Sequence, residues 1–323
     1  MTRLPVFGVG LLVVIGAIVV VVVELSGGSP PSSSAASSAS PSPSVPTSSR
    51  AAAFGAAGAS SAAVPSASVS SSAAPSGTDR GSDPLGSAAA GYLSTRSGVV
   101  LAAVYDLGTG QTWTLGRAGQ VQDEASVVKV DVLETLLAEQ PGGLSGPDQA
   151  LAEQMIEDSD NDAATELWDA VGGANGIRAF NDRVGLSGTT PSPCVECAGF
   201  PWPGWGLTTT TPLDQIALLR ELVSGTGLSA TERNYALRLM ENVTADQRWG
   251  VSGGVPAQAT VALKNGWLPL NSADTDWQIN SVGWVSGLGR NYLIAVLSTG
   301  NPSEAYGIDT IDELSALVWN RMG

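Results

Sequence analysis

A tract of small and polar residues from Ser26 to Ser87 most constrains how this 323-residue chain can fold. The tract consists mostly of Ser, Ala, Pro and Gly and shows no apolar periodicity, so it cannot bury a hydrophobic core. We expect residues 26–87 to form a disordered linker. The remaining residues, 88–323, suit one domain of ordinary enzyme size.

An almost unbroken apolar run, Leu4–Val23, precedes this linker. Its length matches the roughly 20 residues that cross a bilayer. Arg3 stands before the run, and no small-residue cleavage site of a signal peptide follows it. We therefore expect residues 1–25 to be a single-pass anchor in the cell membrane, with the rest of the chain outside. Cleavage of this segment would instead give a secreted protein, and the lack of a nearby cysteine excludes a lipoprotein anchor.

The composition excludes several classes of function. The chain contains no histidine, which rules out Ser-His-Asp catalysis and zinc sites with histidine ligands. Its net charge of −15 argues against nucleic acid as a partner. We expect no metal and no cofactor, and any general base must be a lysine or a carboxylate.

The stretch Glu124–Leu133 places a serine and a lysine three residues apart at the start of an apolar helix. Residues at this spacing lie one turn apart on the same face, so the Lys129 amine can stand beside the Ser126 oxygen. Burial lowers the pKa of a lysine, and a neutral amine can accept a proton from a nucleophile. The alternative is a core helix with a serine cap and a lysine that reaches to water.

The pattern of the remaining residues predicts strands near both ends of the domain and helices between them. Helices are expected over 147–157, 162–171, 174–184, 212–224, 230–242 and 303–322, and strands over 98–105, 111–116, 258–264, 278–286 and 291–298. This order predicts an α/β (α+β) fold, with an antiparallel five-stranded sheet built from both ends of the domain and flanked by helices. A helical lobe is inserted, and a cleft is expected at its boundary with the sheet.

Three short polar motifs follow one another in this framework: Ser126-Val-Val-Lys129, Ser159-Asp160-Asn161 and Lys264-Asn265-Gly266. In this order they resemble the Ser-x-x-Lys, Ser-Asp-Asn and Lys-Thr-Gly motifs of class A β-lactamases and penicillin-binding proteins. The resemblance covers about residues 86–323 and implies the β-lactamase/transpeptidase-like fold. Taken singly, Ser159 and Asp160 could simply cap a helix, and Asn265-Gly266 could simply form a hairpin turn.

The resemblance implies a role for each matching residue. Ser126 would attack a carbonyl and become acylated, with Lys129 as its base or proton relay, and Ser159 would pass a proton to the leaving nitrogen. Lys264 would add positive potential near the substrate carboxylate.

Four further positions would bind the substrate. Asn161 would hold its side-chain amide, and Asn265 stands where the family has a hydroxyl that meets the carboxylate. Gly266 would allow close approach of the strand backbone. The N–H groups of Ser126 and Trp267 would form the oxyanion hole.

The chain also departs from the family pattern. No arginine lies between Lys264 and Gly289, so the usual carboxylate-binding guanidinium is not visible there. Glu196 precedes Thr208-Thr-Thr-Thr-Pro212 at the distance expected of a hydrolytic base, but the family's Glu-x-x-Leu-Asn sequence is absent. Glu196 is therefore either that base or a solvated loop charge. Cys194 and Cys197 frame it, and outside the membrane a disulfide between them is the simplest interpretation.

Two hypotheses follow. The first is an envelope-anchored, monomeric serine hydrolase that cleaves an amide, in a β-lactam or a peptidoglycan peptide, through a Ser126 acyl-enzyme. The second is a catalytically weak or inactive module that binds penicillin or cell-wall fragments. The retained Ser126, Lys129, Ser159 and Lys264 favour the enzyme.

Overall fold

The computed structural model describes residues 83–117, 119–271 and 273–323. The expected anchor and the expected linker up to residue 82 lie outside the described residues. Within the described part, no helix is both long and apolar enough to cross a bilayer. Leu85 is only 4% exposed and packs in the core, so the last residues of the expected linker belong to the folded unit.

Five antiparallel strands form the central sheet in the order β2-β1-β7-β6-β5. Their bounds are β1 Val99–Asp106, β2 Thr112–Leu115, β5 Thr260–Pro269, β6 Trp277–Gly287 and β7 Arg290–Asn301. Strand β1 comes from the start of the domain and pairs along its length with β7 from the end. The sheet therefore joins the two ends of the domain, as the sequence predicts.

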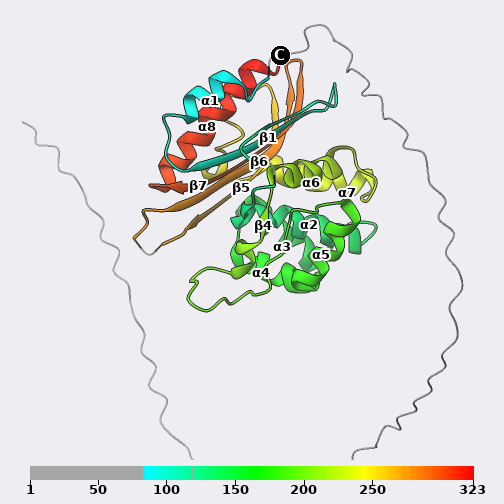
Figure 1. Ribbon diagram of the computed structural model, residues 1–323. Coiled ribbons are helices and arrows are strands. Elements are labelled where there is room, and N and C mark those ends of the chain that lie inside the picture. Colours follow the sequence, from blue (N-terminus) through cyan, green and yellow to red (C-terminus); the bar gives the residue numbers. More distant parts are fainter. Residues whose placement is uncertain (1–82, 118, 272) are drawn as a thin grey trace, which may run out of the picture. The chain divides into compact units, whose positions relative to one another are not determined.

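The strands carry buried residues at successive positions, and successive side chains point to opposite faces, so both faces of the sheet are buried. On β7, Ile294 and Val296 pack in the cluster beneath α1 (Ser87–Leu93) and α8 (Glu304–Arg321), whereas Leu293 and Ala295 pack in the cluster on the opposite face. Figure 1 shows α1 and α8 together along one face of the sheet, with the remaining helices on the other side. The sheet is the middle layer of the domain.

The chain between β2 and β5 forms the inserted helical lobe. Its helices are α2 Val128–Glu139, α3 Gly146–Glu157, α4 Asn161–Ala170, α5 Gly173–Val184, α6 Pro212–Ser224 and α7 Ala230–Glu241. Two short strands, β3 (Gln122–Asp123) and β4 (Thr209–Thr210), pair at the border between lobe and sheet. Helix α2 is buried from Val128 to Leu137, as expected for a helix that is apolar on nearly every side.

Strand β5 differs from the prediction because it does not end at Lys264. It continues to Pro269, and Asn265 and Gly266 pair with Ser281 and Asn280 of β6. A hairpin turn at Asn265-Gly266 is therefore wrong. The backbone groups of these residues belong to the sheet, and the third motif lies inside a strand that borders the lobe.

Candidate active site

Ser126 lies on a strained turn at the entrance to α2. It is the middle residue of a short 3₁₀ turn, Ala125–Val127, that runs directly into the helix. Ala125 has φ of 52°, a left-handed conformation that costs a non-glycine residue about 1 kcal/mol or more. Ser126 is half-buried, while Ala125 and Val127 on either side are buried. The turn therefore presents the serine alone to the surface of the cleft.

Gly266 allows strand β5 to press against this turn. A Cβ atom at position 266 would lie 2.7 Å from both the Glu124 carbonyl oxygen and the Ser126 nitrogen. Real Cβ atoms essentially never come so close to another heavy atom, and backbone atoms cannot move aside. The close approach expected of this glycine is present, and it brings the backbone of β5 beside the Ser126 N–H.

A buried amide on β6 holds the same turn from below. The Asn280 Nδ2 group donates hydrogen bonds to the carbonyls of Asp123 and Glu124, at 2.8 and 2.9 Å. Its Oδ1 accepts from Gln278 Nε2 and from the Ser298 N–H. The sequence analysis missed this network, although Gln278 and Asn280 stand out as polar residues at alternate positions in a buried strand.

Lys129 is fully buried on the first turn of α2, and its amine faces the loop before α4. The Nζ group donates to the Ser159 carbonyl (2.6 Å), to Ser159 Oγ (3.1 Å) and to Asn161 Oδ1 (2.9 Å). Burial, together with the nearby charge of Lys264, holds the pKa of Lys129 well below its usual value, and Asp160 opposes this shift only in part. The amine is thus suited to accept a proton near neutral pH.

Ser159 Oγ lies between two lysines. It accepts a hydrogen bond from Lys264 Nζ at 2.8 Å as well as the one from Lys129. Ser159 has φ of 56°, another left-handed non-glycine residue at the site. Burial lowers the pKa of Lys264 to about 7. Both amines can therefore exchange protons with the serine hydroxyl that joins them.

Within the second motif, Ser159-Asp160-Asn161, it is Asp160 that caps the helix. Its Oδ1 accepts a hydrogen bond from the Ala163 N–H and caps α4. Ser159 and Asn161, on either side, instead contact Lys129. The motif thus has both uses: one residue starts the helix, and its neighbours bind the lysine.

Asn265 does not face the cleft, contrary to its expected contact with substrate. Its Nδ2 donates to the carbonyls of Gln247 and Trp249, and its Oδ1 accepts from Ser281 Oγ. The reason is the pleat of β5, which turns successive side chains to opposite faces. The amide ties β5 and β6 to the loop that follows α7.

The residues around Ser126 enclose a cleft of about 450 Å³. Its lining is Ala125, Ser126, Asp158, Ser159, Asn161, Trp202, Pro203, Trp205, Gly206, Gln247, Trp267, Leu268, Pro269, Trp277 and Glu304. Trp267 comes directly after Gly266, so its backbone lies next to the Ser126 turn, and its ring packs edge-on against Trp249. The predicted Ser126, Ser159, Asn161 and Trp267 all meet in this one cleft.

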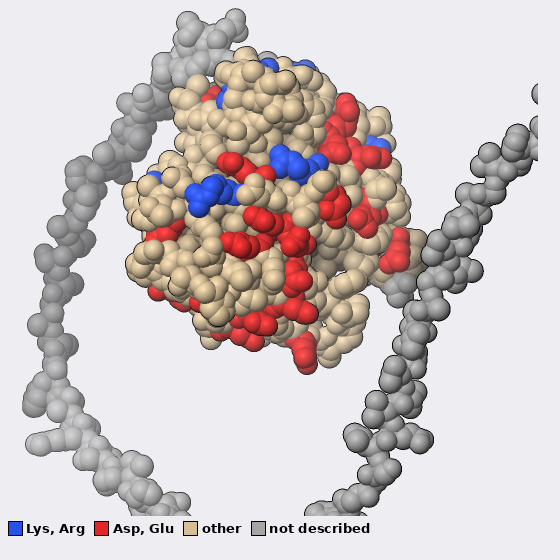
Figure 2. Space-filling view, turned by 180° about the vertical axis from the view of Figure 1, so that it is seen from behind, with Lys and Arg blue, Asp and Glu red and all other residues tan. Residues whose placement is uncertain are grey.

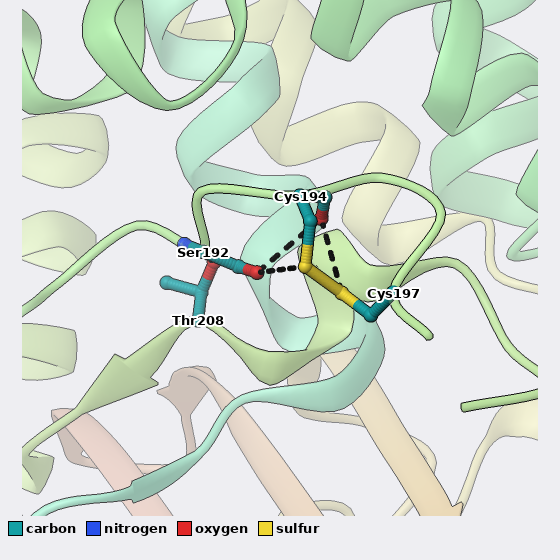
Figure 3. The surroundings of a disulfide bond; sticks show 4 residues. All are labelled: Ser192, Cys194, Cys197 and Thr208. Carbon is teal, nitrogen blue, oxygen red and sulfur yellow. Dashed lines mark hydrogen bonds between the residues drawn. A yellow bond between two sulfur atoms is a disulfide. The ribbon is translucent and has the colours of Figure 1, made fainter. Parts of the chain in front are cut away.

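Glu196 lies elsewhere, which corrects its expected place beside Ser126. It is exposed and does not line the cleft. Cys194 and Cys197 form a disulfide that turns the loop at this point (Figure 3). The Ser192 hydroxyl bonds to the Cys194 carbonyl, and its N–H to Thr208 Oγ1. The short disulfide turn leaves the glutamate pointing to solvent.

Three other carboxyl groups are fully buried behind the Ser126 turn. Glu124 and Glu134 have no hydrogen-bond partner for either oxygen, and Asp131 accepts one bond, from Asn181 Nδ2. Burial raises the pKa of Asp131 to about 7 and raises those of Glu124 and Glu134 well above the usual value. Within the described residues, no group of acidic or sulfur ligands could hold a metal ion.

A sequence model of the β-lactamase enzyme family matches residues 134–322. The chain belongs to this family. The matched segment begins after Ser126 and Lys129, so these two residues are placed in the site by their geometry. As a β-lactamase family member, the chain has the overall fold of the β-lactamase-like serine hydrolases.

Two kinds of protein are similar in sequence to this chain. Putative lipoprotein LppW of Mycobacterium tuberculosis (strain ATCC 25618 / H37Rv) is 28% identical over 222 residues, 65% of this chain and 66% of the relative. Beta-lactamase AER-1 of Aeromonas hydrophila is 25% identical over 188 residues, 58% of this chain and 54% of that protein. The chain spans just under two thirds of the first relative and about half of the second.

Solved structures confirm the β-lactamase/transpeptidase-like fold. The extended-spectrum β-lactamase TLA-1 has a TM-score of 0.64 at 18% identity, covering 75% of this chain and 99% of its own. A class A β-lactamase from Mycobacterium abscessus has a TM-score of 0.58 at 23% identity, with 72% and 96% covered. The protein PBP-A has a TM-score of 0.57 at 21% identity, with 69% and 89% covered.

Proposed function

We propose that the protein is a serine acyl-transfer enzyme that cleaves an amide through an acyl-enzyme on Ser126. The observation that carries this proposal is the group of polar side chains at the cleft. Ser159 Oγ accepts hydrogen bonds from both Lys129 and Lys264, and Lys129 lies three residues after Ser126 at the start of α2. Two buried amines around one hydroxyl provide a proton path, and a path of this kind is needed for amide cleavage.

The steps use these groups in order. Ser126 Oγ attacks the carbonyl carbon and gives its proton to the neutral Lys129 amine. The N–H groups of Ser126 and Trp267 stabilise the oxyanion, a contribution worth about 10²–10³ in rate for each donor. The carbon–nitrogen bond then breaks, and the leaving nitrogen takes a proton from Ser159 Oγ, which is reprotonated by Lys129. Water later releases the acyl group from Ser126.

The last step lacks an evident base. Glu196 is exposed and does not line the cleft, and the resemblance assigns no such role to Asp158 or Glu304, the two carboxylates that do. We therefore propose slow deacylation, so that the acyl-enzyme accumulates as it does in a penicillin-binding protein. This feature also supports the second candidate, a weakly catalytic module that binds β-lactams or peptidoglycan peptides.

We also propose that residues 1–25 anchor a monomeric enzyme in the cell membrane and that residues 26–82 tether it outside. The apolar run Leu4–Val23 supports the anchor. The description of LppW as a putative lipoprotein supports an envelope location for that relative. In this chain both cysteines lie at 194 and 197, so the anchor would be the apolar segment itself.

The test is covalent labelling of the full-length protein, followed by intact-mass measurement. A fluorophosphonate probe should add one label to the wild type and none to Ser126→Ala, while Ser187→Ala, a change at an exposed serine, keeps the label. A p-nitrophenyl ester should then release p-nitrophenolate in a burst and leave an acyl adduct on Ser126 that persists after the free ester is removed. Absence of fluorophosphonate label on folded wild-type protein would overturn the proposal.

A further inference from the structure

The cleft offers no free positive charge to a substrate. Its lining contains two carboxylates, Asp158 and Glu304, and no lysine or arginine among the described residues. Lys264 lies below the surface at 1% exposure, with its amine bonded to Ser159 Oγ and to the Asn265 carbonyl. An anionic group in this cleft would meet like charges and no exposed cation.

The neutral amides nearest the oxyanion position are also occupied. Asn265 comes directly before Gly266 on β5, and Asn280 of β6 pairs with Gly266, but neither residue lines the cleft. Each uses its Nδ2 group for two backbone carbonyls of this chain. Neither has a donor left for a carboxylate.

Aromatic and apolar side chains make up much of the cleft wall. Four tryptophans line the cleft: Trp202, Trp205, Trp267 and Trp277. A second hollow of about 900 Å³ adjoins it and shares Trp202 and Pro269 with it. The rest of its lining is Gly199, Phe200, Pro201, Leu207, Leu270, Asn271 and Asp274.

This second hollow has the features of an acyl-chain groove. Trp202 is 44% exposed and Leu270 is 38% exposed, so two large apolar side chains of the same hollow are open to solvent. The groove begins at the wall of the cleft that holds Ser126, so a chain attached to the reacting carbonyl could enter it directly. The net negative charge of the protein also disfavours an anionic substrate. Asp and Glu outnumber Lys and Arg by 30 to 15, and they predominate on the face shown in Figure 2.

We infer that the substrate is an amide or ester whose acyl group is an uncharged apolar chain, and that this chain lies in the groove between Trp202 and Leu270. Ligands that carry a carboxylate beside the reacting carbonyl are disfavoured. This inference rests on the proposed Ser126 acyl-enzyme and names the class of substrate that reaches it.

The experiment uses p-nitrophenyl esters and the full-length protein, with fluorophosphonate labelling as an independent check on Ser126. The hemisuccinate ester and its methyl ester differ mainly in one charge, and we expect kcat/KM to be at least about tenfold higher for the methyl ester. The octanoate should exceed the acetate by at least about tenfold. Equal acylation rates, a preference for the hemisuccinate, or no acylation by any ester of a protein that the fluorophosphonate does label would overturn the inference. Failure of labelling itself would overturn the proposed function instead.

Three variants, one of them a control, test which residues cause these preferences. Trp202→Ala should lower the octanoate-to-acetate ratio several-fold, and Leu288→Ala, at a 56% exposed leucine in the β6–β7 turn, should leave that ratio unchanged. Glu304→Gln should raise the rate with hemisuccinate relative to its methyl ester, because it removes one negative charge from the cleft lining. If Trp202→Ala keeps the wild-type octanoate-to-acetate ratio, the chain does not lie in this groove, and if Glu304→Gln keeps the wild-type hemisuccinate-to-methyl-ester ratio, the charge of the cleft lining does not set the preference.

Discussion

Helix α2 carries two groups of buried ionisable side chains that have opposite surroundings. Lys129, at 0% exposure, meets Lys264 and Ser159 at the cleft. Asp131 and Glu134, at 1% and 0%, lie among apolar residues of the lobe. In both groups burial disfavours the charged form, so the lysines shift toward the neutral amine and the acids toward the protonated carboxyl.

The two groups differ in their hydrogen bonds. The Lys129 Nζ atom lies within hydrogen-bond distance of three oxygen atoms at the site, whereas both Glu134 oxygens and one Asp131 oxygen have no partner in the described structure. A neutral amine bonded to a cleft hydroxyl can take up and release protons. A protonated carboxyl sealed in apolar surroundings cannot reach a ligand. We therefore assign chemistry to the lysines and a cost in stability to the acids.

The occurrence of lysine rather than arginine at these two positions supports this assignment. Lys129 and Lys264 are the only lysines in the chain, and every other basic residue is an arginine. Arginine stays charged at any physiological pH, but a buried lysine can lose its proton. The two positions that need a titratable amine have one, and they are the two that meet at Ser159.

The largest expected effect is that of removing the amine of Lys129. Lys129→Met should lower the rate of Ser126 acylation by about 10²–10⁴-fold, the usual contribution of a general base. Lys129→Arg keeps a positive charge but cannot act as a base near neutral pH, so it should not restore the rate. Stopped-flow acylation with a p-nitrophenyl ester measures both. Recovery of most of the activity in Lys129→Arg would mean that the site uses the charge of this residue and not its basicity.

The second prediction concerns the lysine pKa values themselves. With only two lysines, full-length protein labelled with ¹³C-lysine should show two side-chain signals, and Lys264→Met identifies one of them. The Lys264 signal should titrate near pH 7, and the Lys129 signal well below the usual lysine range. Lys264 therefore carries its charge below about pH 7 and loses it above. A lysine that titrates above pH 10 would show that its amine is not held neutral by burial.

The third prediction tests the acids through protein stability. Asp131 has a pKa of about 7 in the folded protein against 3.8 for the free side chain. Between these two values the unfolded chain ionises while the folded chain keeps its proton, so stability falls as pH rises. Above pH 7 the accumulated loss for this one residue is about 4 kcal/mol, at roughly 1.4 kcal/mol per unit.

Asp131→Asn should remove this loss, since an amide oxygen can still accept the bond from Asn181 Nδ2. Urea unfolding at pH 5 and pH 8 measures the difference, and Asp169→Asn at an exposed position is the control. The variant should gain most at pH 8 and little at pH 5. An equal effect at both values would contradict the assignment of a raised pKa to Asp131.

Of the two groups compared above, the sequence predicted most of the residues in the group around Lys129 and Lys264. The motif residues Ser126, Lys129, Ser159 and Lys264 are recognisable because chemistry fixes their types and the helices fix their spacing. Asn265 was placed wrongly because the strand was expected to end at Lys264. Once β5 is known to continue, strand alternation puts residues 264 and 266 on one face and residue 265 on the other.

Other features of the site could not be predicted from the sequence. Glu196 lies in a loop without periodicity, where a disulfide turn decides the direction of the side chain. The hydrogen bond from Asn280 to the Glu124 carbonyl, which supports the Ser126 turn, joins residues 156 positions apart, and only the register of β6 reveals it. The apolar groove likewise depends on two distant loops that carry Trp202 and Leu270. These features come from tertiary contacts that have no local signal.

The last prediction has the smallest expected effect and concerns Glu124, a buried acid close to Ser126. Glu124 is two residues from Ser126, fully buried, and has a pKa raised well above the usual value by burial and by the charges of Asp131 and Asp214. Its carbonyl supports the turn, but its carboxyl points into the lobe beside the other acids. Glu124→Gln replaces a protonated carboxyl by an amide of the same shape, so acylation and deacylation rates at pH 7 should stay within about twofold of wild type, a difference of roughly 0.4 kcal/mol. A much slower deacylation would mean that Glu124 is the missing hydrolytic base and that the acids behind the turn, like the lysines before it, exchange protons with the substrate.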